Sequence, residues 1–231
     1  MENIPGYIPL LFAGTTVFTI YLFYRATYRS KKVLAVITGW LLLQAVIGLS
    51  GFYKVTNTRP PHFLFLTFPP VLFILFLFIT RKGRQWLDSL NIKTLTLLHI
   101  VRIPVEIVLF LLCTYKAIPL LMTFEGRNFD IISGLSAPLI YLLCFSKNKT
   151  RVIALLAWNL VCLGLLVNIV TIAVLSAPLP FQQLSFDQPN TAILYFPYIW
   201  LPGFVVPVVL LSHLAAIRQL LYKRTPIPDH A

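Results

Sequence analysis

The sequence contains little charge. Charged residues make up 11% of its 231 positions, whereas ordinary soluble domains carry about 25%. Acidic residues are the scarcest class, with 7 Asp and Glu against 19 Lys and Arg, while 58% of all residues are hydrophobic. This composition excludes an ordinary soluble domain and predicts an all-α protein that crosses a membrane several times.

The motifs of common catalytic and metal centres are also absent. The four histidines form neither an HxxxH nor an HExxH pair, and they lie at mismatched predicted depths. There is no Gly-rich phosphate loop, no GxSxG motif and no CxxC pair, so the corresponding enzyme and zinc classes are not indicated. Cys113, Cys144 and Cys162 lie inside apolar runs and suit packing. We therefore expect no cofactor and no metal.

Seven apolar segments approach the ~20 residues that are needed to cross the hydrocarbon core of a bilayer. The third is the least regular, because Pro69 and Pro70 interrupt its middle, but membrane helices tolerate proline when neighbouring groups satisfy the freed carbonyls. We expect a single integral membrane domain over residues 1–231 with seven transmembrane helices. The segments cover residues 7–24, 33–53, 63–80, 95–115, 129–146, 152–175 and 191–217.

Lys and Arg residues alternate between the predicted loops. The loops after the first, third, fifth and seventh segments hold 14 of the 19, and the other loops hold only Lys54, Arg59, Lys116 and Arg127. The positive-inside rule then places the N-terminus outside and the C-terminus in the cytoplasm. The 14 are Arg25, Arg29, Lys31, Lys32, Arg81, Lys82, Arg84, Lys93, Lys147, Lys149, Arg151, Arg218, Lys223 and Arg224.

This alternation also explains the net charge of +12. The excess positive charge is assigned to the cytoplasmic face, where it meets anionic lipid headgroups, so nucleic-acid binding is not needed to account for it. We expect membrane lipids as partners, no nucleic acid, and a location in the bacterial inner (cytoplasmic) membrane.

The fourth segment carries three ionisable residues, His99, Arg102 and Glu106. A helix turns by about 100° per residue, so these residues fall within roughly 60° of one another on one face. A charge at membrane depth costs at least ~2.5–3.5 kcal/mol, which is tolerable if the face looks into protein or water. We interpret this face as the wall of a buried polar site. The alternative is an Arg102–Glu106 ion pair at i,i+4 spacing that only locks helices together.

A second polar group precedes the fifth segment on the outer side. Gly134 would let the helix that follows approach a neighbour closely. Because consecutive antiparallel helices usually pack together, we expect Arg102–Asp130 or Glu106–Arg127 contacts. The alternative is a capped helix start with salt bridges in the loop. The group consists of Glu125, Arg127, Asn128 and Asp130.

Aromatic residues at the start of the seventh segment complete the predicted site. Tyr195 and Tyr198 share a face if this segment is helical from its beginning. His213 lies near the predicted cytoplasmic end of the segment, and we interpret it as structural. Asn159 and Asn168 lie about 180° apart on an ideal helix, so both cannot line the same site.

The sequence thus predicts a multi-pass membrane protein with a polar, charged pocket in its non-cytoplasmic half that binds or transports a small polar or amphipathic ligand. Arg102 or Arg127 would hold an anionic group, and Glu106 could exchange a proton. Two alternatives stay open: an intramembrane enzyme acting on a lipid-linked substrate, and an accessory protein whose charges only fix helix packing. Ligand identity and oligomeric state are not predicted. The candidate ligand-binding residues are His99, Arg102, Glu106, Glu125, Arg127, Asn128, Asp130, Tyr195 and Tyr198.

Overall fold

The computed structural model describes residues 4–145 and 151–222. Within these ranges the regular structure is helical and contains no strand, as the sequence predicts. Short 3-10 helical turns and one π-helical turn join some of the α-helices. The α-helices are α1 (Tyr7–Ala26), α2 (Lys31–Leu49), α3 (Leu64–Ile79), α4 (Arg81–Ser89), α5 (Ile92–Leu98), α6 (Arg102–Thr114), α7 (Ile131–Phe145), α8 (Val152–Leu175) and α9 (Val206–Tyr222).

Five helical segments in the described part of the chain are long and apolar enough to cross a membrane. They are α1, α2, the run Ile92–Thr114 that contains α5 and α6, α8, and the run Leu201–Tyr222 that contains α9. α3 and α4 become a sixth if this pair, which is bent by 96°, counts as one span. α7 is apolar but has only 15 residues. The helices therefore suit a membrane protein, and a count of seven spans depends on α3 and α7.

The last helix begins and ends later than expected. We predicted a span over 191–217, but the continuous helical run is Leu201–Tyr222. Residues 191–199 form turns instead, which backbone hydrogen bonds from Thr191 and Ala192 tie to Ala117 in the loop after α6. Pro197 and Pro202 lack backbone N–H groups, so a helix that extends back through both would leave carbonyls without donors.

The fourth predicted span, 95–115, lies within the helical run Ile92–Thr114, whose geometry changes locally at a 3-10 turn. α5 and α6 are joined by the 3-10 turn η2 (His99–Val101). Pro104 lies one turn further on and cannot donate to the carbonyl of Ile100, which favours a local change of helical geometry. His99 and Arg102 therefore lie where α5 meets α6, and Glu106 lies one turn further along α6.

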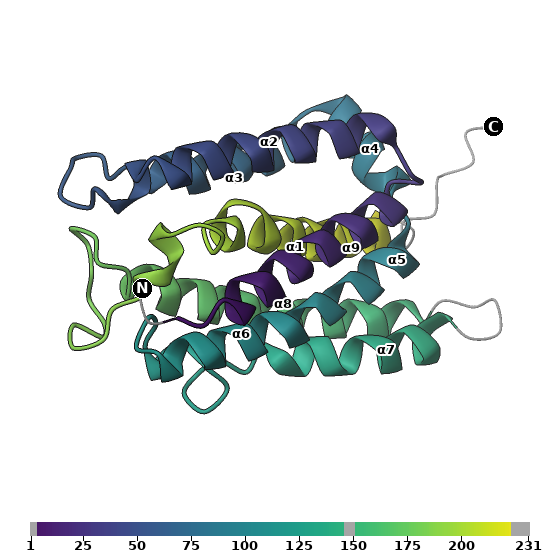
Figure 1. Ribbon diagram of the computed structural model, residues 1–231. Coiled ribbons are helices and arrows are strands. Elements are labelled where there is room, and N and C mark those ends of the chain that lie inside the picture. The colour runs from purple at the N-terminus through teal and green to yellow at the C-terminus, as the bar shows by residue number, and fades with distance from the viewer. Residues whose placement is uncertain (1–3, 146–150, 223–231) are drawn as a thin grey trace, which may run out of the picture.

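Two groups of helices make up the molecule (Figure 1). α2 and α3 form an antiparallel hairpin over α1 and α9, and α4 turns across one end of it. Below the hairpin, α1 lies along α5 and α6, α8 lies along α9, and α5 contacts both α7 and α9. This lower group encloses the main hydrophobic core.

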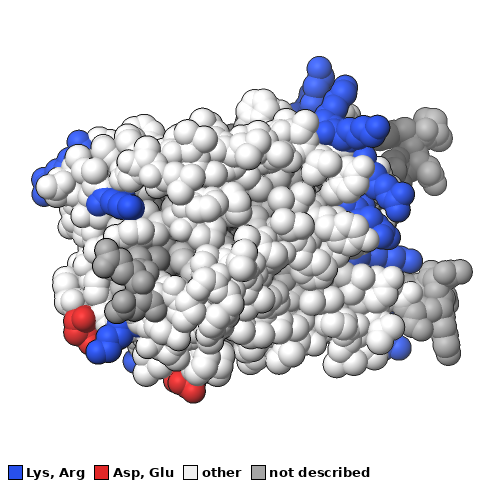
Figure 2. Space-filling view, in the orientation of Figure 1, with Lys and Arg blue, Asp and Glu red and all other residues white. Residues whose placement is uncertain are grey.

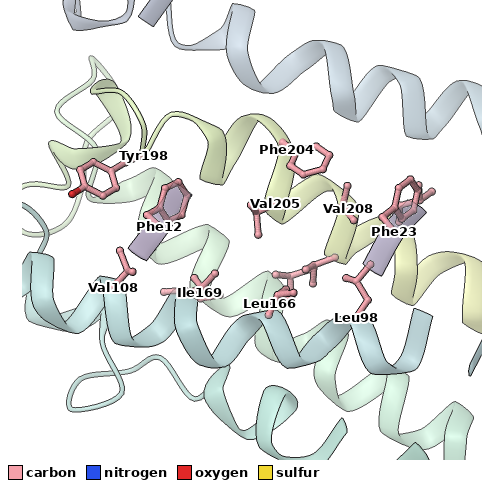
Figure 3. Packing of buried hydrophobic residues seen from close by; sticks show 14 of the residues in the cluster. Phe12, Phe23, Leu98, Val108, Leu166, Ile169, Tyr198, Phe204, Val205 and Val208 are labelled. Carbon is pink, nitrogen blue, oxygen red and sulfur yellow. The ribbon is translucent and has the colours of Figure 1, made fainter. Parts of the chain in front are cut away.

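Large apolar side chains from α1, α5, α6, α8 and α9 meet in that core (Figure 3). Phe12 of α1 packs against Tyr198 with ring centroids 5.5 Å apart. Burial of such side chains contributes about 1.5–3 kcal/mol each in water, whereas inside a membrane close packing rather than water exclusion supplies the contact energy. The labelled residues are Phe12, Phe23, Leu98, Val108, Leu166, Ile169, Tyr198, Phe204, Val205 and Val208.

Lys and Arg side chains gather at one end of the molecule (Figure 2). At this end, hereafter the basic end, α1 ends, α2 begins and α4 crosses. The visible acidic side chains lie at the opposite end, among a few basic ones. Lys147, Lys149, Lys223 and Arg224, which contributed to the predicted alternation, lie outside the described residues.

α6 and α7 approach each other closely at Gly134, as the sequence predicts. A Cβ atom at this position would lie 2.8 Å from Cγ1 of Ile103 and 3.3 Å from Cβ of Arg102. A larger residue would therefore push α7 away from the start of α6. Gly164 of α8, by contrast, has open space around it, because a Cβ atom added there would meet nothing within 4 Å.

These two glycines provide a matched test of the contact. We expect Gly134→Ala to lower stability by about 1–3 kcal/mol through overpacking. Gly164→Ala should leave stability unchanged or raise it by up to about 1 kcal/mol, because alanine favours helix. Unfolding of the detergent-solubilised protein, followed by circular dichroism, measures both. Equal effects of the two substitutions would contradict the close approach of α6 and α7.

Candidate functional site

A buried ion pair joins α6 to the residue just before α7. Nη1 of Arg102 lies 2.5 Å from Oδ1 of Asp130. Both residues are almost fully enclosed, with exposed fractions of 2% and 5%. This is one of the two contacts that the sequence predicts for the region, and the alternative Arg102–Glu106 pair does not form.

Two further hydrogen bonds of the Arg102 guanidinium reach two other helices. Nη1 also donates to the carbonyl of Cys162 in α8 at 3.4 Å, and Nη2 lies 2.9 Å from Nε2 of His213 in α9. A guanidinium has no acceptor atom, so Nε2 of His213 accepts this hydrogen bond. Arg102 therefore connects α6, α7, α8 and α9 through one side chain.

The other ring nitrogen of His213 fixes its tautomer. Nδ1 lies 2.9 Å from Oδ1 of Asn159, whose Nδ2 donates to the Leu155 carbonyl at 2.8 Å. Because Nε2 accepts from Arg102, Nδ1 carries the ring proton and donates to Asn159. The imidazole is therefore neutral in this arrangement.

Aromatic rings close this part of the site. His99 stacks on His213 with ring centroids 3.9 Å apart and planes inclined by 18°. Trp158 meets His99 edge-on at 5.4 Å, and its Nε1 donates to Oγ of Ser136 at 2.9 Å. The indole of Trp158 thus contacts both of the stacked histidines.

Glu106 has a different partner from the one expected. Nδ2 of Asn128 lies 2.7 Å from each carboxylate oxygen and 3.0 Å from the carbonyl of Met122. Oδ1 of Asn128 accepts from the backbone N–H of Asp130 at 3.0 Å. Asn128 therefore bridges Glu106 to the residue that pairs with Arg102.

These residues form what we call the polar core. With Arg102 and Asp130 opposed and His213 neutral, Glu106 in its ionised form gives the polar core a net charge of −1. The described residues supply no ion pair to Glu106. Nδ1 of His99 and Nε of Arg102 are buried and have no hydrogen-bond partner among the described residues. The polar core consists of His99, Arg102, Glu106, Asn128, Asp130, Trp158, Asn159 and His213.

The other predicted site residues lie elsewhere. Glu125 and Arg127 are exposed on the loop before α7, where the Arg127 carbonyl accepts from Nδ2 of Asn168 at 2.9 Å. The Tyr195 ring lies under Nζ of Lys54, 4.7 Å from its centroid. Tyr198 packs in the apolar core. The shared face expected for the two tyrosines is absent because the helix starts only after them.

His213, Asn159 and Trp158 are the members of the polar core that the sequence did not indicate. The mismatched depth assigned to His213 was wrong, since its ring stacks on His99. The error follows from the predicted end of the last span at residue 217, whereas the helix continues to Tyr222. Asn159 and Asn168 do face different surroundings, as their spacing predicts.

The polar core lies apart from two cavities of the structure. Neither the cavity of about 490 Å³ beside the α2–α3 hairpin nor the small one of about 10 Å³ next to Tyr198 is lined by its residues. Within the described ranges, no group of three or more His, Cys, Asp or Glu residues is placed to hold a metal ion. The ionisable residues of the polar core can exchange a proton or pair with a charged group, provided that one of the enclosing side chains moves.

The family described as a domain of unknown function (DUF8737) matches residues 60–221. No curated protein and no solved structure matches the chain. The matched range holds the whole polar core, whereas α1 and α2 precede it.

The chain offers an internal control for the buried ion pair. Asp130→Asn leaves Arg102 charged and enclosed, so we expect a loss of about 3–5 kcal/mol in stability. Asp88→Asn removes the partner of Arg218 in a partly exposed ion pair, in which the Arg218 side chain is 24% exposed and the Asp88 side chain 30%. This substitution should cost about 0–1 kcal/mol. Denaturant unfolding in detergent measures both. Similar small losses would show that Asp130 does not neutralise Arg102.

Proposed function

The chain belongs to the family described as a domain of unknown function (DUF8737), and we propose that it is a multi-pass integral membrane protein that binds or transports a small polar or amphipathic ligand at Glu106. The ligand carries a positively charged group, or its binding is coupled to a proton that Glu106 takes up. The polar core holds this carboxyl group in place.

The observation that carries this proposal is that Arg102 pairs with Asp130 and leaves the buried Glu106 without a cationic partner among the described residues. Glu106 is buried, and its hydrogen bonds come from the neutral amide of Asn128. Arg102, the nearby cation, is directed at Asp130 instead. A buried carboxylate without a cationic partner is unfavourable, so binding of a proton or an ammonium group at Glu106 is stabilising.

The same geometry argues against Arg102 as the holder of an anionic group. Three of its hydrogen bonds are made to Asp130, Cys162 and His213. A ligand anion would have to displace Asp130 and would add a second negative charge beside Glu106. A cation meets neither obstacle.

Access to Glu106 is proposed from the end opposite the basic end, through the loop before α7. Asn128 closes over the carboxylate and bonds to Met122 in the same loop. The exposed Glu125 and Arg127 flank this position in the sequence. Rotation of the Asn128 side chain would open Glu106 without breaking the Arg102–Asp130 pair.

We further propose one membrane domain over 1–231 with seven spans, N-terminus outside and C-terminus in the cytoplasm, in the bacterial inner membrane. α3 and α7 are short for a bilayer of ordinary thickness, and local thinning of the bilayer accommodates short helices at modest cost. The gathering of Lys and Arg at the basic end supports its cytoplasmic assignment.

The hydrogen bonds of Arg102 to Asp130, Cys162 and His213 also favour a second candidate function, an accessory protein in which these charges only hold α6 to α9 together. In that case Glu106 contributes to stability and exchanges nothing. The two functions differ in whether the carboxyl group reacts and binds cations in the folded protein.

Glu106 is tested with dicyclohexylcarbodiimide, which modifies protonated carboxyl groups in apolar surroundings. We expect modification of Glu106, detected by peptide mass spectrometry, to decline as pH rises and as methylammonium is added. Glu106→Gln should abolish it, and Glu125→Gln, which alters an exposed carboxyl group, should not. If Glu106 does not react and Glu106→Gln lowers the melting temperature, the result contradicts binding at Glu106 and supports the accessory function.

Orientation is tested by cysteine labelling in a Cys113→Ser background. Glu125→Cys should react with a membrane-impermeant maleimide on intact cells, whereas Gln85→Cys of α4 should react only after permeabilisation. Both positions are exposed in the protein, so access through the membrane is the only difference intended. The reverse pattern would overturn the proposed orientation.

A further inference from the structure

An apolar groove separates the α2–α3 hairpin from α1 and α9. Its volume is about 490 Å³, within the 300–1,000 Å³ range of small-molecule sites. Phe23 of α1 and Val208 of α9 lie side by side in its wall, next to Phe204 (Figure 3). Ile37 of α2 and Ile74 of α3 face them. The groove is separate from the site of the proposed function, since none of its lining residues belongs to the polar core.

The groove has the length of one leaflet of a bilayer. Its lining spans eight residue steps on each of three helices, from 32 to 40 on α2, from 69 to 77 on α3 and from 203 to 211 on η6 (Leu201–Val205) and α9. At 1.5 Å per residue this is roughly 12 Å. Half of a hydrocarbon core of about 30 Å is only slightly more.

One end of the groove is closed by a hydrogen bond between its walls. Nε1 of Trp40 in α2 donates to the carbonyl of Gly203 at 2.9 Å. A Cβ atom on Gly203 would lie 2.6 Å from Cδ1 of Leu66 in α3, so all three walls meet there. A chain that enters from the basic end therefore stops near mid-membrane.

The other end lies at the basic end and carries Lys32. No carboxylate in the described part of the chain pairs with Lys32, and Asp88 is already paired with Arg218. Arg81 and Lys82 at the start of α4 are exposed close to the groove residue Trp86. The rim therefore presents positive charge, while the groove below it is apolar.

The groove is also open sideways. Val36 of α2 and Phe73 of α3 line it, yet 68% and 53% of their surfaces are exposed. A molecule already in the membrane can therefore enter laterally between the two helices, without passing through water.

We propose that the groove binds an anionic phospholipid from the leaflet at the basic end. One acyl chain lies between the hairpin and α9, and the phosphate lies at Lys32. The length of the groove matches a chain of one leaflet, the closed end limits its depth, and the unpaired lysine at the rim selects a negative headgroup.

The test compares phosphatidylglycerol with phosphatidylcholine of the same acyl chains, added to the purified full-length protein in detergent. We expect phosphatidylglycerol to raise the melting temperature by several degrees and to stay bound in native mass spectrometry, with phosphatidylcholine much weaker. Lys32→Gln should weaken phosphatidylglycerol binding about fivefold, as expected for one basic residue at a membrane surface. Lys31→Gln is the matched control, because Lys31 does not line the groove.

Filling the groove gives a second, independent measurement. Val36→Trp should abolish the shift caused by phosphatidylglycerol, whereas Ala35→Trp, on the neighbouring exposed position outside the groove, should preserve it. Soluble glycerol phosphate should cause no shift, because it has no acyl chain. Equal binding of the two lipids, or equal effects of Lys31→Gln and Lys32→Gln, would overturn the proposal.

Discussion

The contact between Arg102 and Asp130 is the constraint on which the rest of the structure depends. A charge inserted alone at the centre of a membrane helix costs at least ~2.5–3.5 kcal/mol. Here the guanidinium meets a carboxylate at 2.5 Å, a carbonyl from α8 and an imidazole from α9. The pair forms only if α7 comes close to α6, which Gly134 permits. Four helices thus meet at Arg102, and one glycine permits the closest of these approaches to its ion pair.

Local periodicity predicted much of this arrangement. The spacing of His99, Arg102 and Glu106 places them on one face, and all three are buried. The small residue at Gly134 indicated a close helix contact, and the order of the segments indicated Arg102–Asp130. Each of these predictions needs only neighbouring residues or consecutive helices, where sequence distance and spatial distance are closely related.

The remainder depends on where distant helices sit along the membrane normal, and the sequence leaves this open. A shift of the last helix by a few residues decided whether His213 lies beside His99 or far from it. The partner of Glu106 was unpredictable for a related reason. Asn128 is a good capping residue, and its side-chain oxygen does accept from the Asp130 N–H, but its amide hydrogens turn to the carboxylate of another helix.

α9 links the two sites of the molecule because it forms a wall of each. Its residue Val208 and the preceding Phe204 line the apolar groove, while His213 bonds to Arg102. At about 100° per residue, His213 lies roughly 140° from Val208, on the far side of α9. A rigid helix cannot move one face alone. An occupant of the groove that displaced α9 as a rigid body would therefore also change the His213–Arg102 distance.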